Sequence, residues 1–189
     1  MKAGSIQDAE TADTVRNLVE IINEAYTWGE RGMWREGCIR TNPVEVADLL
    51  RCGQLLLCMD GDEVAGCVRC EIDPKFTGVA HIGMLCVRRS CGKQGFGRRL
   101  LDFAVDTAHS AGCTEVDLEI LQPRDWIHET KSWLATWYSS VGFEFTGESR
   151  ELVDPGLTSP SVFRHMRKKL TLQEGVTPAT ELTIHVQTR

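Results

Sequence analysis

The chain has 189 residues, a length that suits one domain. Hydrophobic residues make up 42% of it and charged residues 25%, as in soluble globular proteins, so the composition argues against long disorder. The formal net charge of −6 disfavours nucleic acid as a partner, because phosphate contacts need a positively charged face.

The N-terminal segment and the cysteines indicate the cellular location. No apolar stretch follows Lys2, as a signal peptide would require, and no apolar run approaches the roughly 18 residues of a membrane span. We therefore expect a cytoplasmic protein with no membrane contact, in which the eight cysteines are free thiols. Cys67 and Cys70 form a C-x-x-C, but three residues apart on a predicted strand they face opposite sides, so we expect no metal site.

The first half of the chain predicts helices followed by antiparallel strands. Val15, Leu18, Val19 and Ile22 have helical spacing, and Asn42 followed by Pro43 and Glu45 is a helix start. The predicted elements are a short strand at 5–7, helices at 13–26 and about 42–52, and strands at 54–59, 63–72 and 78–87. Residues 27–41 between the helices lack a period and contain two tryptophans, which predicts a loop.

The second half predicts a strand–helix–strand unit, a helix and a hairpin. The elements are a helix at 95–111, a strand at 115–121, a helix at 131–141 and strands at 143–148 and 162–170. Together the elements predict an α/β (α+β) fold. It has a single mixed, mostly antiparallel sheet of six to seven strands with helices on both faces.

One segment carries the clearest chemical signal. Within residues 82–101 a buried strand runs into a turn with Gly92, Gly95 and Gly97, and the turn opens a helix. Glycines let backbone amides approach an anion, and the helix N-terminus adds unpaired N–H groups, which is the physics of a pyrophosphate site. The segment fits neither the Walker pattern nor the dinucleotide fingerprint.

The segment resembles the cofactor motif of the GNAT superfamily of N-acetyltransferases. Its strand signature L-x-V is matched by residues 85–87, and its glycine loop by residues 92–97. The family usually has Gln or Arg where this chain has Gly92, and Lys93 or Arg98 is then expected to supply the contact. The resemblance implies acetyl-CoA as co-substrate and no metal. The cofactor-binding residues it implies are Leu85, Cys86, Val87, Lys93, Gln94, Gly95, Phe96, Gly97, Arg98 and Arg99.

A second block, residues 134–148, is similar to the later family block of a helix, a tyrosine and Gly-Phe before a strand. Tyr138 matches the tyrosine that protonates the leaving thiolate in the family. The resemblance implies direct attack of an amine on the thioester, polarised by a strand amide such as that of Cys86. Glu119 and Glu71 are the alternatives for the base. Lys131 stands where the family often has an asparagine that contacts the cofactor.

The acceptor is the least defined part of the prediction. In the family the first two helices and their connection shape the acceptor pocket. Trp28, Trp34 and Glu36 of that connection are therefore the candidate substrate residues, for a small-molecule or peptide amine. A non-catalytic acyl-CoA-binding or regulatory module on the same fold is the alternative function.

The resemblance covers about residues 5–170, which we take as the catalytic domain, with residues 171–189 as an extension. Leu182, Ile184 and Val186 alternate with polar residues, a period-two strand pattern. We expect this segment to add an edge strand to its own sheet or to a partner's, the second case giving a homodimer.

Overall fold

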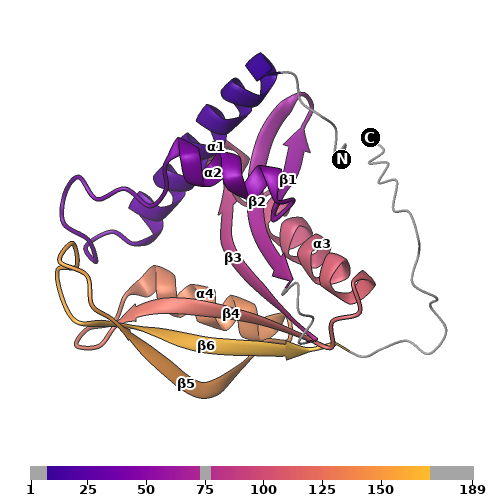
Figure 1. Cartoon of the computed structure of the whole chain (residues 1–189). Coiled ribbons are helices and arrows are strands. Elements are labelled where there is room, and N and C mark those ends of the chain that lie inside the picture. Colours follow the sequence, from indigo (N-terminus) through magenta and orange to yellow (C-terminus); the bar gives the residue numbers. More distant parts are fainter. Residues whose placement is uncertain (1–7, 73–77, 171–189) are drawn as a thin grey trace.

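The computed structural model describes residues 8–72 and 78–170 of the chain (Figure 1). The strands predicted at 5–7 and 181–187 lie outside these residues. The dimer predicted from the second of these strands therefore lies outside them as well. The elements in chain order are α1 (Asp8–Gly29), α2 (Pro43–Arg51), β1 (Leu55–Asp60), β2 (Glu63–Ile72), β3 (Val79–Val87), a 3-10 turn (Arg89–Cys91), α3 (Phe96–Ser110), β4 (Glu115–Pro123), α4 (Glu129–Ser140), β5 (Glu144–Leu152) and β6 (Ser161–Lys169).

A single sheet of six strands forms the centre of the fold, in the order β1-β2-β3-β4-β6-β5. Only β3 and β4 are parallel, and the other neighbouring strands are antiparallel. One core cluster joins the sheet to α3 and α4, and the other joins it to α1 and α2. The predicted mixed, mostly antiparallel sheet with helices on both faces is therefore confirmed.

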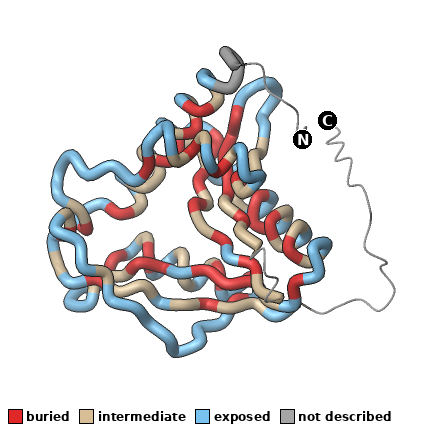
Figure 2. The backbone as a smooth tube through the Cα atoms, viewed as in Figure 1, coloured by how far each residue is buried: buried red, intermediate tan, exposed pale blue. Residues whose placement is uncertain are grey.

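Burial follows the two faces of the sheet. Figure 2 shows buried positions along β2, β3 and β4 and on the inner sides of α1 and α3. Cys67 packs in the α1 cluster and Cys70 in the α3 cluster, which confirms that they face opposite sides. β5 forms an edge of the sheet and is exposed at every residue except Leu152.

The helix ends follow the local sequence closely in α2 and less closely in α1. The Asn42 side chain accepts hydrogen bonds from the Val44 amide at 3.0 Å and the Glu45 amide at 3.1 Å, so the predicted cap is confirmed. Helix α1 continues to Gly29, past the predicted end at 26. The extra residues are poor helix formers, but the buried ion pair of Glu30 described below anchors this end of the helix.

β3 and β4 separate after a short ladder. Their parallel pairing runs only from Val79–Glu115 to Ile82–Leu118. Past the end of this ladder, the register between β2 and β3 shifts. Met84 and the residue after it oppose a single residue of β2, which is a β-bulge, and Met84 there has a φ of 47°. The two strands diverge from that point (Figure 1). The divergence opens the inside of the sheet to small molecules.

Candidate active site

A cavity of about 760 Å³ lies where β3 and β4 diverge. Its walls come from the end of α1 and the loop after it, from β3 and β4, from α4, and from β5 and β6, with one residue each from α2 and β2. Segments from both halves of the chain therefore meet at one place. The volume is in the usual range for a small-molecule site.

Tyr138 of α4 lines this cavity and is 9% exposed. Its ring is tilted against Trp137, with centroids 4.9 Å apart, and meets Phe143 edge-on at 5.8 Å. Burial raises the pKa of Tyr138 above its usual value, and Tyr26 and Cys86 close to it raise it further. The phenol is therefore protonated at neutral pH and is available as a proton donor.

Tyr26 and Arg40 also line the cavity. The Arg40 guanidinium carbon lies 4.8 Å from the centroid of the Tyr26 ring. Burial and the nearby Cys86 raise the pKa of Tyr26, while Arg40 lowers it. A side-chain hydrogen bond with Cys67 and burial raise the pKa of the Cys86 thiol, so this thiol is protonated and unsuited to act as a nucleophile.

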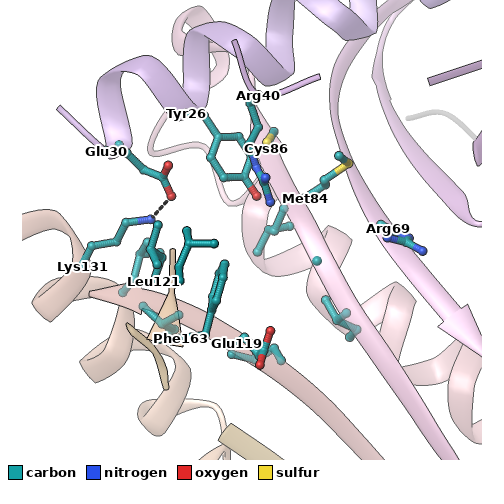
Figure 3. A pocket seen from close by; sticks show the side chains of 18 of the residues that line it. Tyr26, Glu30, Arg40, Arg69, Met84, Cys86, Glu119, Leu121, Lys131 and Phe163 are labelled. Atoms are coloured by element: carbon teal, nitrogen blue, oxygen red, sulfur yellow. Dashed lines mark hydrogen bonds and ion pairs between the residues drawn. The ribbon is translucent and has the colours of Figure 1, made fainter. Parts of the chain in front are cut away.

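A buried ion pair joins α4 to the end of α1 (Figure 3). Lys131 Nζ donates to Glu30 Oε1 at 2.6 Å, and the two side chains are 9% and 6% exposed. The Trp34 indole donates to the other Glu30 oxygen at 2.6 Å. Lys131 and Tyr138 are seven residues apart and so share one face of α4. The ion pair thus fixes the helix that carries the tyrosine against α1.

Glu119 lies on the far side of the cavity, on β4. Its Oε2 accepts a hydrogen bond from Arg150 of β5 at 2.8 Å. Within the described residues Oε1 has no hydrogen-bond partner. One carboxylate oxygen is therefore free to accept a proton.

Next to Glu119 is a polar network that spans β4, β6 and β5. Asp117, 2% exposed, accepts two hydrogen bonds of 2.7 Å from Arg167 and lies 2.9 Å from His165 Nε2. The other ring nitrogen of His165 lies 3.0 Å from Thr146 Oγ1. Burial alone would raise the pKa of Asp117, but the hydrogen bonds from Arg167 and the proximity of His165 hold it below its usual value.

The glycine loop follows β3 outside the cavity. Gly95 has a φ of 85° and Lys93 a φ of 59°, so two left-handed residues turn the chain into α3. The amides of residues 93–98 donate no hydrogen bond to any described residue, and the helical pattern starts with the Arg99 amide on the Gly95 carbonyl at 3.0 Å. Six unpaired amides of this kind suit a pyrophosphate, so the loop fits the expected co-substrate.

The basic side chains of the loop differ in their availability. The Arg98 Nε–H donates to both carboxylate oxygens of Asp102 at 2.8 Å, so the positive charge of Arg98 is compensated. Lys93 and Arg99 are exposed and have no carboxylate partner within the described residues. Lys93 is therefore better placed than Arg98 to make the contact that Gly92 lacks.

The structure brings together only part of the predicted site. The predicted site residues that line the same cavity are Leu85, Cys86, Glu119, Tyr138 and Trp34. The rest of the cofactor set, Val87, Lys93, Gln94, Gly95, Phe96, Gly97, Arg98 and Arg99, lies past it on β3, the loop and α3. Trp28 and Glu36 are exposed and do not line it.

The lining residues that the sequence did not single out include Tyr26, Glu30, Arg40 and His165. Tyr26 and Glu30 are four residues apart at the end of α1, but the predicted helix ended at residue 26, and Arg40 and His165 lie far apart in the chain, so no local pattern joins these residues. The unusual lysine at 131 was visible, but its partner was not.

Comparison with known proteins identifies the architecture. A family model described as "Acetyltransferase (GNAT) family" matches residues 15–126. No curated protein matches the sequence significantly. The matched region begins within α1 and extends past the end of β4, which is more than half of the chain.

Several solved structures share the fold. A ribosomal-protein-alanine N-acetyltransferase from Brucella melitensis has 18% identity and a TM-score of 0.62, covering 84% of this chain and 96% of its own. YncA from Salmonella typhimurium, a putative acetyltransferase solved with its cofactor acetyl-CoA, has 18% identity and a TM-score of 0.60, covering 93% and 95%. The PaiA N-acetyltransferase from Thermoplasma acidophilum, solved with coenzyme A, has 16% identity and a TM-score of 0.55, covering 84% and 94%. At these identities the likeness is one of fold.

None of the helices in residues 8–72 and 78–170 is both long and apolar enough to span a bilayer.

Proposed function

The chain belongs to the acetyltransferase (GNAT) family, and from this we propose that it transfers an acetyl group from acetyl-CoA to an amine by direct attack within a ternary complex. The observation that carries the proposal is the protonated Tyr138 in a cavity whose β3 wall leads into a loop where six amides have no hydrogen-bond partner among the described residues. Two of the similar structures contain acetyl-CoA or coenzyme A, which supports the same co-substrate here.

The loop and the start of α3 would hold the pyrophosphate. The unpaired amides of residues 93–98 donate to its oxygens, and Lys93 and Arg99 add positive charge. The rest of the co-substrate then runs back along β3 towards the cavity. In this arrangement the thioester end, and not the phosphate end, would lie beside Tyr138.

The register of β3 favours Leu85 over Cys86 as the amide that polarises the thioester carbonyl. The Arg88 amide donates to the Ala65 carbonyl of β2 at 2.8 Å. In an antiparallel ladder alternate residues bond to the same neighbour, so the Cys86 amide also turns towards β2. The amides of Leu85 and Val87 then point away from β2, to the side where β4 has diverged. An amide that is free in this way can donate to the oxyanion that forms on the thioester carbonyl.

The proposed chemistry needs two proton transfers. The amine nitrogen of the acceptor bonds to the thioester carbon, and the carbon–sulfur bond breaks. Tyr138 gives its phenolic proton to the departing thiolate, while a base takes a proton from the amine nitrogen. Both protons are thereby accounted for, and the tyrosinate regains its proton from solvent or from the base.

We propose Glu119 as that base, because it lines the cavity and its Oε1 has no hydrogen-bond partner among the described residues. His165 is a weaker candidate, since both of its ring nitrogens already have partners. Trp34, held by Glu30, would form a wall of the acceptor pocket. We do not assign Trp28 and Glu36 a role in this pocket.

The test compares transfer with binding. Tyr138→Phe removes one oxygen and keeps the ring packing, so kcat should fall by roughly 10²–10⁴ with unchanged CoA affinity by calorimetry. Glu119→Gln should also lower kcat with unchanged CoA affinity. Wild-type protein that binds CoA but acetylates no amine would instead support the non-catalytic acyl-CoA-binding module.

A further inference from the structure

Arg40 differs from the other basic side chains of the cavity. Within the described residues it has no carboxylate within ion-pair distance. The other lysine and arginine side chains that line the cavity each have one: Lys131 with Glu30 at 2.6 Å, Arg69 with Glu71 at 2.6 Å and Arg150 with Glu119 at 2.8 Å. A guanidinium with no carboxylate partner among the described residues of a ligand pocket is available to bind an anionic group.

Arg40 is held in place although it lies in a loop. Asn23 of α1 accepts hydrogen bonds from the amides of Arg40 at 2.8 Å and Thr41 at 3.0 Å, and its own amide donates to the Thr41 carbonyl at 3.0 Å. The guanidinium packs over the Tyr26 ring, as Figure 3 shows. The side chain is thus preorganised, which lowers the cost of binding a ligand.

The carboxylates nearest to Arg40 are already engaged. Glu30 binds Lys131 and Trp34, and Glu45 accepts a hydrogen bond from Thr41 Oγ1 at 2.8 Å. Neither lies within ion-pair distance of the guanidinium. Both still favour its charged form, so Arg40 presents a full positive charge to the cavity.

The position of Arg40 limits the distance between an anion and the reacting amine. Tyr26, against which it packs, lines the same cavity as Tyr138 and lies close enough to Tyr138 to raise the pKa of that phenol. A carboxylate bound to Arg40 is therefore one aromatic ring away from the proposed reaction centre. Only a few bonds can separate such a carboxylate from an amine that attacks there.

We propose that Arg40 binds a carboxylate of the acceptor, so that the acceptor is a small amine carrying a free carboxylate close to the amine, as in an α-amino acid. The inference rests on the proposed acetyl transfer. A guanidinium fork binds a carboxylate through two parallel hydrogen bonds and fixes its orientation. An amide or peptide acceptor has no charge at this point and leaves Arg40 unpaired, which the site penalises.

The experiment uses the full chain, acetyl-CoA and a panel of L-amino acids paired with their own α-amides, with CoA release as the signal. Wild-type protein should prefer the acids, by about 10- to 100-fold in kcat/KM. Arg40→Gln should lower kcat/KM for the acids by that factor, mainly through KM, and leave the amides unchanged. Arg40→Lys should keep part of the preference. Arg35→Gln is the control, because Arg35 is an exposed arginine of the same loop that does not line the cavity.

Two results would overturn the inference: amides used as well as acids by the wild type, or an equal loss for both classes in Arg40→Gln. If neither class is acetylated, the proposed function fails, and calorimetry of the acids in the presence of CoA decides the role of Arg40 separately. Weaker binding in Arg40→Gln than in wild type supports it. Equal binding, or no binding of any acid to the wild type, refutes it.

Discussion

The buried pair of Lys131 and Glu30 allows a quantitative prediction. Lys131→Met keeps the aliphatic length of the side chain but leaves the Glu30 carboxylate with the Trp34 indole alone. Removing one partner of a buried ion pair costs about 3–5 kcal/mol. The pair borders a cavity that water can enter, so we expect the lower end, about 3 kcal/mol.

This loss converts into a melting shift. For a chain of this size 1 kcal/mol corresponds to about 2–4 °C, so Lys131→Met should melt about 6–12 °C below wild type. Circular dichroism during heating, and urea unfolding at constant temperature, measure it. The control is Lys169→Met, an exposed lysine at the end of β6, which should stay within about 0.5 kcal/mol of wild type.

A second substitution tests the cause. Glu30→Gln added to Lys131→Met removes the uncompensated charge while its amide oxygen still accepts from Trp34. The double variant should therefore be more stable than Lys131→Met by at least about 1 kcal/mol. Melting of Lys131→Met within about 2 °C of wild type, or a double variant no better than the single one, would refute the reasoning.

Three further outcomes are expected. Gly97→Glu should melt like wild type, because a Cβ at this position meets only Val87 Cγ2 at 3.7 Å. The variant should bind CoA at least about tenfold more weakly by calorimetry, because its carboxylate places a negative charge at the anion site. Asp117→Asn should be less stable than wild type at neutral pH, because the folded state lowers the pKa of the Asp117 carboxylate and is stabilised by its charge. In urea titrations the difference in unfolding free energy should shrink below about pH 4, where the wild-type carboxylate takes up its proton. A thiol titration of unreduced, denatured protein should count eight reactive groups, since all eight cysteines are free.

Local sequence patterns predicted the parts of the fold that depend on neighbours in the chain. The apolar spacing of 13–26, the Asn42 cap and the glycines at 95 and 97 each act within a few residues, so each could be interpreted alone. The same holds for the family motif and for Tyr138, whose placement in the cavity was expected from its own block of sequence. The extended end of α1 was missed, because it is stabilised by a contact with α4.

By itself, the sequence determined the family, the mixed sheet and the loop with its unpaired amides. Only the tertiary structure decided what surrounds the acceptor. Glu30 and Lys131 are 101 residues apart, and Asp117 and Arg167 are 50 apart. The Glu30–Lys131 pair forms where the end of α1 meets α4 beside the cavity, and the Asp117–Arg167 pair joins directly opposed residues of β4 and β6. Which charges find partners in this way, and that Arg40 has no carboxylate partner among the described residues, depends on tertiary contacts to which no local pattern is sensitive.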